Sequence, residues 1–178
     1  MTIDEAIEGR RSIRSYRAQP VPEDLIAEIL DLARRAPSSM NGQPWRFLVV
    51  RDQETKTRLA ALKNKHCPAE KRTYPADFLI HAPAVILVSV ERSQSHGREI
   101  ENGVLATAFL LLAAQSRGLS GVYLSAYQKE SPQLAEDIRH LLRIKEGIEP
   151  VTLVPIGFPA DMLPPKRLRP LKEVIRFD

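Results

Sequence analysis

PSSMNGQPW, residues 37–45, is the stretch that says most about the fold of this chain. Its polar side chains, which can both donate and accept hydrogen bonds, are those of Ser38, Ser39, Asn41 and Gln43. Gly42 permits a tight turn, and Trp45 is the only tryptophan of the chain. Taken alone, the stretch is typical of a loop with ordinary turn residues, or of a loop that holds a ligand.

The flanks of this stretch predict a helix before it and a strand after it. Pro22 suits a first helical turn, and Pro37 is expected to end the helix. The apolar residues between them recur at helical spacing, namely Leu25, Ile26, Ile29, Leu30 and Ala33. After the loop, WRFLVV (45–50) is rich in β-formers and predicts a strand.

Elsewhere in the first half of the chain, the same signals predict alternating helices and strands. Thr2 and Glu5 form a capping-box pattern ahead of a short helix that runs to about Gly9. Asp52 can cap a helix that carries Leu59 and Leu62. AVILVSV (84–90) is a continuous apolar run of buried-strand length, whereas 66–83 predicts an irregular connection.

The second half of the chain continues this alternation. A long helix over 98–117, closed by Gly118, is apolar almost all round, so it lies in the core or is partly covered by another chain. Strands are expected at 121–126, 151–159 and 171–177, with a helix starting at Ser131-Pro132. The pattern predicts one α/β or α+β domain over residues 1–178, with a central sheet flanked by helices.

Composition excludes several classes of protein. The 178 residues are 43% hydrophobic and 27% charged, which argues against disorder, and the net charge is +4. The only cysteine, Cys67, permits no intrachain disulfide, and the histidines lack metal-ligand spacing. There is no phosphate-loop motif, and 6% aromatic residues do not suit a nucleic-acid platform. The longest apolar run, 104–114, is too short to span a bilayer, so we expect a cytoplasmic protein.

Two basic clusters are candidates for binding an anion. In RRSIR (10–14), Arg10 and Arg14 share a face if the turn is helical, with Ser12 between them. Arginine forks and a hydroxyl match phosphate oxygens, although a solvated basic surface explains the same pattern. The second cluster, PPKRLRP (164–170), is held extended by its prolines, and spacing does not say whether the two clusters meet.

Together and in this order, these pieces resemble the nitroreductase family of FMN-dependent oxidoreductases. RRSIR (10–14) is similar to the phosphate motif near the start of that family, and PSSMNGQPW (37–45) to its specific P-S-[ST]-x-N-x-Q-P-W signature. AFLLLAAQSRGLSGVYLSA (108–126) is similar to its central helix, turn and strand, and VPIGFP (154–159) with KRLRPLKEV (166–174) to its closing strand and tail. The resemblance covers nearly the whole chain.

The resemblance implies an α+β domain with a central, mixed but mainly antiparallel sheet between helices, built as an intertwined homodimer. Two FMN molecules would lie at the subunit interface, and NADH or NADPH would be the co-substrate. The apolar helix over 98–117 would then form the dimer core. The last strand, 171–177, would reach across to the sheet of the partner.

The resemblance also implies roles for individual residues. The FMN phosphate and ribityl chain would be held by Arg10, Arg11 and Ser12, while Arg14 would face the pyrimidine end of the ring. A backbone N–H for flavin N5 or O4 would come from among Tyr123, Leu124, Ser125 and Ala126. The other subunit would supply Pro37, Ser38, Ser39 and Asn41, and the phosphate site would be completed by one or more of Lys166, Arg167 and Arg169.

Two departures from the family pattern stand out. The usual Gly-Leu-Gly turn is Gly118-Leu119-Ser120-Gly121 here, which leaves the local register open. An asparagine that touches the ring in many relatives has only Asn64 as a nearby counterpart, and its alignment is poor. The substrate side of the ring is therefore not described by the sequence.

The resulting hypothesis is an enzyme that moves electrons from NAD(P)H through FMN to a small organic acceptor such as a nitroaromatic, quinone or enone, in a ping-pong order. No side chain need act as a catalytic nucleophile, because the flavin performs the chemistry. Three alternatives remain open: another flavin reaction such as dehydrogenation, flavin fragmentation or dehalogenation; flavin binding without turnover; and a basic nucleic-acid binder, which would be colourless.

Overall fold

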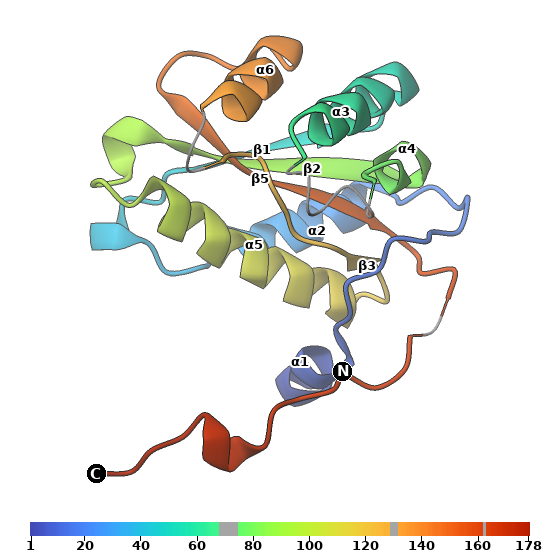
Figure 1. Cartoon of the computed structure of the whole chain (residues 1–178), viewed down its shortest axis with the longest axis vertical. Coiled ribbons are helices and arrows are strands. Elements are labelled where there is room, and N and C mark those ends of the chain that lie inside the picture. The colour runs from blue at the N-terminus through green and yellow to red at the C-terminus, as the bar shows by residue number, and fades with distance from the viewer. Residues whose placement is uncertain (68–74, 129–131, 162) are drawn as a thin grey trace.

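The computed structural model describes residues 1–67, 75–128, 132–161 and 163–178. It is an α+β structure in which an open sheet lies between two layers of helices (Figure 1). The predicted irregular connection over 66–83 falls partly on 68–74, which is outside the described residues. Ser131, at the expected start of the last predicted helix, is also outside them.

The sheet has the strand order β1-β2-β5-β3, and β4 also pairs with β5. Its strands are β1 (Trp45–Val50), β2 (Ala84–Glu91), β3 (Ser120–Gly121), β4 (Leu124–Ser125) and β5 (Ile148–Gly157). All these pairs are antiparallel, and a single parallel bridge joins Ser12 to Gly121. The mixed, mainly antiparallel sheet that we predicted is confirmed.

Helices cover both faces of this sheet (Figure 1). On one face lie α2 (Glu23–Ala33) and α5 (Glu99–Ser116), with α1 (Ile3–Gly9) against α5. On the other face lie α3 (Gln53–Lys65), α4 (Phe78–His81) and α6 (Gln133–Leu141). Short 3-10 turns follow at Ser39–Asn41 (η1), Arg92–Gln94 (η3) and Leu171–Glu173 (η4).

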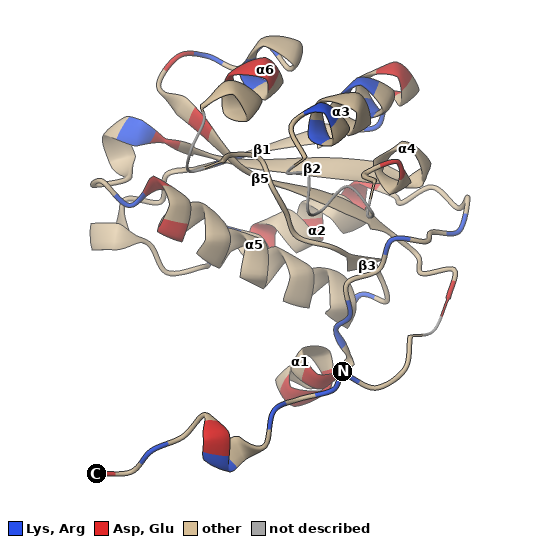
Figure 2. Cartoon of the chain, in the orientation of Figure 1, with Lys and Arg blue, Asp and Glu red and all other residues tan. Residues whose placement is uncertain are grey.

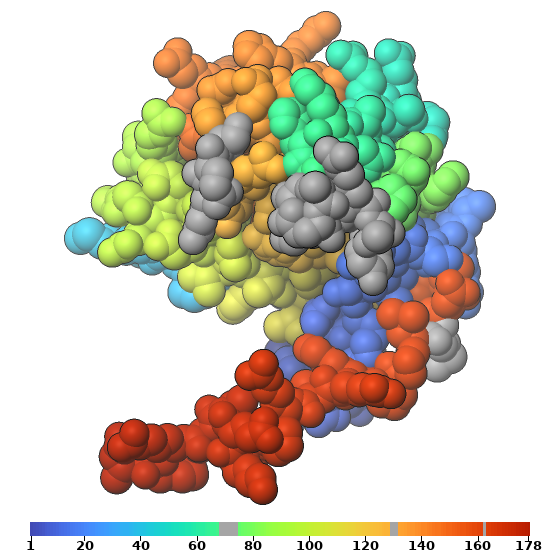
Figure 3. Space-filling model, viewed as in Figure 1, coloured from blue at the N-terminus to red at the C-terminus, as the bar shows by residue number. Residues whose placement is uncertain are grey.

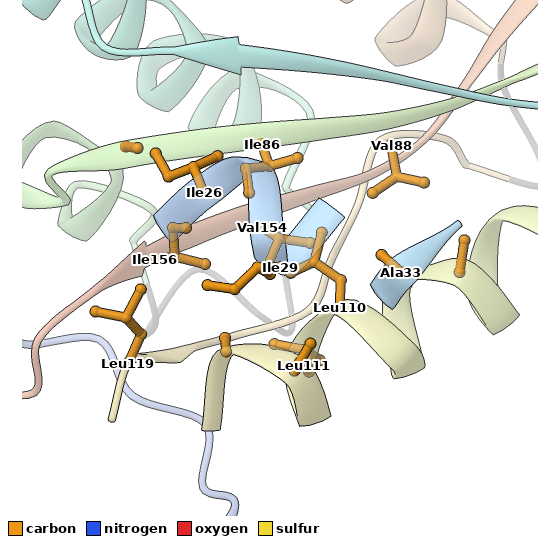
Figure 4. Close-up of a cluster of buried hydrophobic side chains, with 14 of the residues drawn as sticks. Ile26, Ile29, Ala33, Ile86, Val88, Leu110, Leu111, Leu119, Val154 and Ile156 are labelled. Carbon is orange, nitrogen blue, oxygen red and sulfur yellow. The ribbon is translucent and has the colours of Figure 1, made fainter. Parts of the chain in front are cut away.

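The alternation of side chains along β2 builds two separate cores. Ile86 and Val88 point to the side of α2 and α5, whereas Val85 and Leu87 pack with α3, α4 and α6. Figure 4 shows the first core, where side chains of α2 meet Leu110 of α5 beneath the sheet. Because both faces of β2 are buried, its sequence is a continuous apolar run, as predicted.

Three helix ends lie where local sequence signals predict them. The Thr2 hydroxyl accepts from the Glu5 backbone N–H and the Glu5 carboxylate accepts from the Thr2 N–H, which completes the predicted capping box. The Asp52 carboxylate caps α3 by accepting from the Thr55 N–H. Gly118 ends α5 with a φ of +74°, in the left-handed region that glycine favours.

The single strand predicted over 121–126 is wrong, because two short strands, β3 and β4, stand in its place. β3 pairs with Gly157 and Ile156 of β5, and β4 pairs with Leu153 and Thr152. The interruption lies opposite the stretch that contains Pro155. A proline has no N–H to donate, so it breaks the ladder on that edge.

The strand predicted over 171–177 is also wrong in this structure. Leu171–Glu173 forms η4, and the remaining residues run as an exposed tail that stands away from the rest of the molecule (Figure 3). A strand requires a neighbour for its N–H and C=O groups. Within one chain the tail satisfies them locally instead, as when the Val174 N–H donates to the Leu171 carbonyl at 3.1 Å.

An ion-pair cluster joins the end of α3 to α6, and it yields a prediction about acid stability. The Asp137 carboxylate accepts from His66 Nε2 at 2.8 Å and from Lys65 Nζ at 3.1 Å. The hydrogen bond from His66, then those from Gln133 and Lys65, lower the pKa of the Asp137 carboxyl well below its usual range. The stabilisation is therefore fully present above the unfolded pKa of about 4 and is lost as pH falls through the lower native pKa.

We expect Asp137→Asn to lower the urea midpoint at pH 7 modestly, because the cluster is partly exposed. The difference from the parent protein should shrink as pH falls from 5 to 3. Urea titrations at several pH values measure it, and a difference that stays constant with pH would contradict the role of Asp137.

Candidate functional site

The arginine segment, residues 10–17, is extended and runs along the edge of the sheet. The Ser12–Gly121 bridge and the Ile13 N–H, which donates to the Gly121 carbonyl at 3.2 Å, fix it beside β3. The sequence predicted that Arg10 and Arg14 would share a face if this segment were helical, but the segment is not helical. Ser12 and Arg14 nevertheless share a side, because side chains alternate along extended chain and Ile13 between them is buried.

Arg11 uses part of its guanidinium to hold the backbone together. Its Nη1 donates to the carbonyls of Glu8 at 2.6 Å and Arg10 at 2.9 Å, and its Nε donates to the Pro164 carbonyl at 3.2 Å. These contacts satisfy a carbonyl at the end of α1 and attach the start of the tail to the arginine segment. Because a guanidinium has five N–H groups, Arg11 Nη2 can still serve another acceptor.

Arg14 lies over an aromatic ring at the other end of the segment. Its guanidinium carbon is 5.7 Å from the centre of the Phe78 ring, at the start of α4. A cavity of about 270 Å³ borders this segment, lined by Ser12, Ile13, Arg14, Ser15, Asp161 and Leu163. The segment therefore presents a cation and a hydroxyl beside an open space.

Tyr16 fixes the turn that follows Arg14. Its hydroxyl lies 2.8 Å from the Ile13 carbonyl and 3.2 Å from the Pro155 carbonyl, so it joins the segment to β5. Burial raises the pKa of Tyr16 strongly, and the Arg14 charge opposes only part of that rise. The hydroxyl therefore keeps its proton at neutral pH and remains a donor to these carbonyls.

Among the four candidates at 123–126, the pairing of β4 excludes Ala126 and leaves the Ser125 N–H directed away from β5. The Ala126 N–H donates to the Val151 carbonyl at 2.9 Å and is therefore occupied in the sheet. Along an antiparallel strand this direction alternates from residue to residue. Ser125, the residue before Ala126, therefore turns both its N–H and its C=O away from β5. The Ser125 carbonyl accordingly accepts from Lys63 Nζ at 2.7 Å, and the Ser125 N–H faces the same way.

The helices α3 and α4 link Ser125 to Arg14. Lys63, which contacts Ser125, is followed by Asn64, whose Nδ2 donates to the Asp77 carboxylate at 2.7 Å. Asp77 precedes Phe78, the residue under Arg14. Asn64 also accepts from the Ala76 N–H at 2.7 Å, so in this chain it holds α4 in place. Arg14 and Ser125 therefore both contact the layer formed by α3 and α4.

The loop at 37–43 lies elsewhere, at the first turn of α5. The Ser39 N–H donates to Asn102 Oδ1 at 2.9 Å, and the Gln43 N–H donates to the Ser38 hydroxyl at 3.0 Å. Asn41 Oδ1 accepts from Gln43 Nε2 at 3.2 Å. The loop is thus an ordered structure of its own, with the Met40 side chain 83% exposed.

One chain does not bring the loop and the arginine segment together. α5 has 18 residues, so its two ends are roughly 27 Å apart. The loop contacts Asn102 in the first turn, whereas Gly9, just before the arginines, lies against Gln115 in the last turn. The predicted loop residues and the predicted arginines therefore occupy opposite ends of the molecule.

The basic residues of the tail are exposed and begin close to the arginine segment. Pro164 is attached to Arg11, and the predicted residues that follow it are Lys166, Arg167 and Arg169. Figure 2 shows the positive charge of the tail and of the segment beside α1. The structure brings the start of the two clusters together, and it leaves all three tail cations open to solvent.

Two residues that contact the predicted site were not singled out from the sequence. Asn102, which is 1% exposed, holds the loop, and Lys63 holds Ser125. Asn102 carried a signal, because an asparagine inside an otherwise apolar helix must find partners. Lys63 carried none, since a lysine near a helix end is ordinary at the surface.

The outward face of α5 is apolar and exposed. Its exposed apolar positions are Leu105, Ala108 and Phe109, and the half-buried Leu112 continues them at helical spacing. Next to them a cavity of about 360 Å³ runs between α1 and α5. The sequence left two explanations for this apolar helix, burial in the core or cover by another chain. In the structure one side of α5 lies in the core, and the other side is an apolar surface.

Within the described residues, none of the helices has the length and apolarity that crossing a membrane requires. The same part of the chain holds no group of three or more His, Cys, Asp or Glu side chains that could bind a metal ion.

Comparison with known proteins gives one consistent result. The model of the nitroreductase family matches residues 7–158. An NADH dehydrogenase of Thermus thermophilus is 36% identical, with 93% of this chain and 91% of that protein covered, and an iodotyrosine deiodinase of Thermotoga neapolitana is 32% identical with the same coverage. The structure of an FMN-dependent nitroreductase from Clostridium difficile shares the fold, with a TM-score of 0.84, 23% identity, and 98% of each chain covered. On these matches, the chain belongs to the nitroreductase family.

Proposed function

We propose that this protein is an FMN-dependent oxidoreductase that takes electrons from NAD(P)H and passes them to a small organic acceptor in a ping-pong order. Its membership of the nitroreductase family supports the enzyme class. The observation that carries the proposal is that Ser12 and Arg14 present a hydroxyl and a cation beside one cavity, while Ser125 contacts the same layer of helices as Arg14. Bound FMN would supply the redox chemistry there, accepting hydride equivalents and releasing them to an acceptor.

The residues present fit the chemistry of FMN. A phosphate requires cationic and hydroxyl donors, and Arg10, Arg11 Nη2 and Ser12 lie together on the extended segment. Arg14 would place a fixed positive charge where negative charge develops on flavin reduction. The N–H of Ser125, with its carbonyl already satisfied by Lys63, would donate to the ring edge.

The proposal includes a homodimer, in which each site is completed by the partner. An isologous contact between two copies of α5, running in opposite directions, would bring the loop of one subunit to the arginine segment of the other. The apolar face of α5 supports such a contact. In the same dimer the tail, with exposed Leu171, Val174 and Phe177, would reach the partner's sheet, and β1 pairs only with β2 among the described strands.

The same proposal places residues 1–178 in one domain and the protein in the cytoplasm. The loop residues Pro37, Ser38, Ser39 and Asn41 would pack on the flavin held by the partner, and Lys166, Arg167 or Arg169 would reach its phosphate. The loop roles rest on a motif inside the family match over residues 7–158, and the tail roles rest on the resemblance of KRLRPLKEV (166–174) and on the contact of Arg11 with Pro164.

The visible spectrum of the purified protein is the most direct test. We expect flavin bands, release of FMN on denaturation, and NADH or NADPH oxidation that depends on an acceptor. A colourless protein that neither binds added FMN nor oxidises NAD(P)H would overturn the proposal. Bound FMN without NAD(P)H oxidation would instead support flavin binding without turnover.

A second candidate reaction is reductive dehalogenation, because a relative at 32% identity is an iodotyrosine deiodinase. The acceptor panel should therefore include iodotyrosine beside a nitroaromatic, a quinone and an enone. Iodide release at a rate above that of nitroaromatic reduction would favour this second candidate.

Arg14 gives a specific prediction about the cofactor. We expect Arg14→Ala to slow flavin reduction by NAD(P)H or weaken FMN retention about tenfold or more, because it removes a charge that stabilises the reduced flavin. Arg17→Ala is the matched control, since Arg17 Nε donates to the Pro159 carbonyl, beyond the cavity. Stopped-flow reduction and FMN titration measure the effect. Unchanged retention and reduction in Arg14→Ala would show that Arg14 does not face the flavin.

A further inference from the structure

Asn102 is a buried polar residue in the first turn of α5, and it joins two loops. Its Oδ1 accepts from the Ser39 N–H at 2.9 Å, and its Nδ2 donates to the Ser95 carbonyl at 3.1 Å. The side chain is 1% exposed. Both ends of the amide are therefore engaged, one with the loop at 37–43 and one with the segment that precedes α5.

The loop that Asn102 contacts has an unfavourable backbone. Met40, Asn41 and Gln43 have positive φ values of 47°, 55° and 46°. Residues other than glycine adopt such values at a cost of order 1–3 kcal/mol each, and they persist only where the surroundings hold them. The loop therefore needs external anchors in order to keep this shape.

The anchor is itself held rigidly by the sheet. A Cβ on Gly103 would lie 2.6 Å from the Val151 side chain, so α5 sits directly on β5 at this point. The position of Asn102 is thus fixed by the centre of the sheet, and the amide transmits this position to the loop.

We propose that Asn102 is a positioning residue of the cofactor site, which holds loop 37–43 in the shape that reaches the flavin of the partner subunit. The inference rests on the proposed function, because that function places the loop over the partner's FMN. Asn102 acts on the flavin only through the Ser39 N–H and the Ser95 carbonyl. Its removal should therefore affect cofactor binding more than the fold.

The test compares FMN affinity with stability in matched variants of the full-length protein. We expect Asn102→Ala and Asn102→Asp to raise the FMN Kd about tenfold or more at pH 8, because each leaves a buried group of the two loops without its partner. Thr107→Val is the control. It removes two buried hydrogen bonds, those of the Thr107 hydroxyl with the Gly103 carbonyl and the Thr152 hydroxyl, without touching the loop. It should therefore lower the urea midpoint and leave the FMN Kd within about twofold of the parent value.

Asn102→Asp adds a readout that a merely structural role would not change. When the new carboxyl is protonated it can again donate to the Ser95 carbonyl, whereas the carboxylate cannot. Relative to the parent, the FMN affinity of Asn102→Asp should therefore recover as pH falls from 8 to 5, and that of Asn102→Ala should not. Absence of this recovery would overturn the inference.

A second pair of variants removes the contact from the loop side, in case changes at Asn102 prevent folding. Ser39→Pro and Ser39→Ala both lose the hydroxyl, but only proline loses the N–H that Asn102 accepts. Ser38 is already extended and Ser39 begins a 3-10 turn, so proline fits the backbone there. We expect Ser39→Pro to bind FMN about tenfold more weakly than Ser39→Ala, and equal affinities would overturn the inference.

The outcomes separate this inference from the proposed function. A parent protein that binds no FMN would overturn the proposed function and, with it, the role of Asn102. A parent protein that binds FMN, with Asn102→Ala binding equally well, would overturn the role of Asn102 alone.

Discussion

Phe109→Lys is expected to convert the dimer to a monomer and to remove bound FMN. Phe109 is 39% exposed at the centre of the apolar face of α5, beside Leu105. In the proposed dimer a lysine there would bury a charge without a partner, which costs several kcal/mol and weakens association by more than about 100-fold. Because each site would need the partner's loop, FMN should leave with the dimer.

Light scattering coupled to size-exclusion chromatography measures the mass, and the visible spectrum of the same peak measures the flavin. Ala61→Lys is the control, since it adds the same charge at an exposed position of α3 on the opposite face of the sheet. It should leave both the mass and the flavin unchanged. A Phe109→Lys protein that stays dimeric and yellow would contradict the placement of α5 at the interface.

Gly42→Ala is expected to cause the largest loss of FMN affinity by a single methyl group. Gly42 has a φ of −67°, which any residue can adopt, so glycine is needed there because no space is left for a side chain. A Cβ there would lie 2.1 Å from the Gln94 carbonyl oxygen, which is backbone and cannot rotate away. Displacing the loop at a cost of about 3 kcal/mol would weaken FMN binding by on the order of 100-fold.

Titration of FMN fluorescence measures this affinity, and urea unfolding measures stability in parallel. Gly147→Ala is the matched control, because Gly147 has a φ of +82° and open space around it. That variant should lose about 1 kcal/mol of stability from backbone strain and keep its FMN affinity. If Gly42→Ala binds FMN as tightly as Gly147→Ala, the loop does not contribute to the cofactor site.

Signals that act over a few residues were reliable in this chain. The Thr2 capping box, the Asp52 cap and the Gly118 ending were all confirmed, because each depends on hydrogen bonds between residues within one turn. The buried strand β2 was confirmed because its continuous apolar sequence suits burial on both faces.

The predictions that failed depended on partners distant in the sequence. The strand expected at 121–126 was divided because its neighbour on β5 contains Pro155. The tail at 171–177 formed a 3-10 turn because a single chain offers it no neighbouring strand. The arginine segment became extended because Gly121 holds it against β3. In each case the neighbour that decided the conformation lies far away along the chain.

By itself, the sequence determined the family, the succession of helices and strands, and the residue types that a flavin phosphate requires, because these follow from motifs and local hydrogen bonding. Tertiary structure alone decided how those residues are arranged. It placed PSSMNGQPW (37–45) and RRSIR (10–14) at opposite ends of α5. It also directed the Ser125 carbonyl away from β5 and hydrogen-bonded Asn102 to the loop. The physical reason is that a side chain's neighbours across a sheet or helix face are fixed by packing between distant segments, which spacing along the chain does not encode.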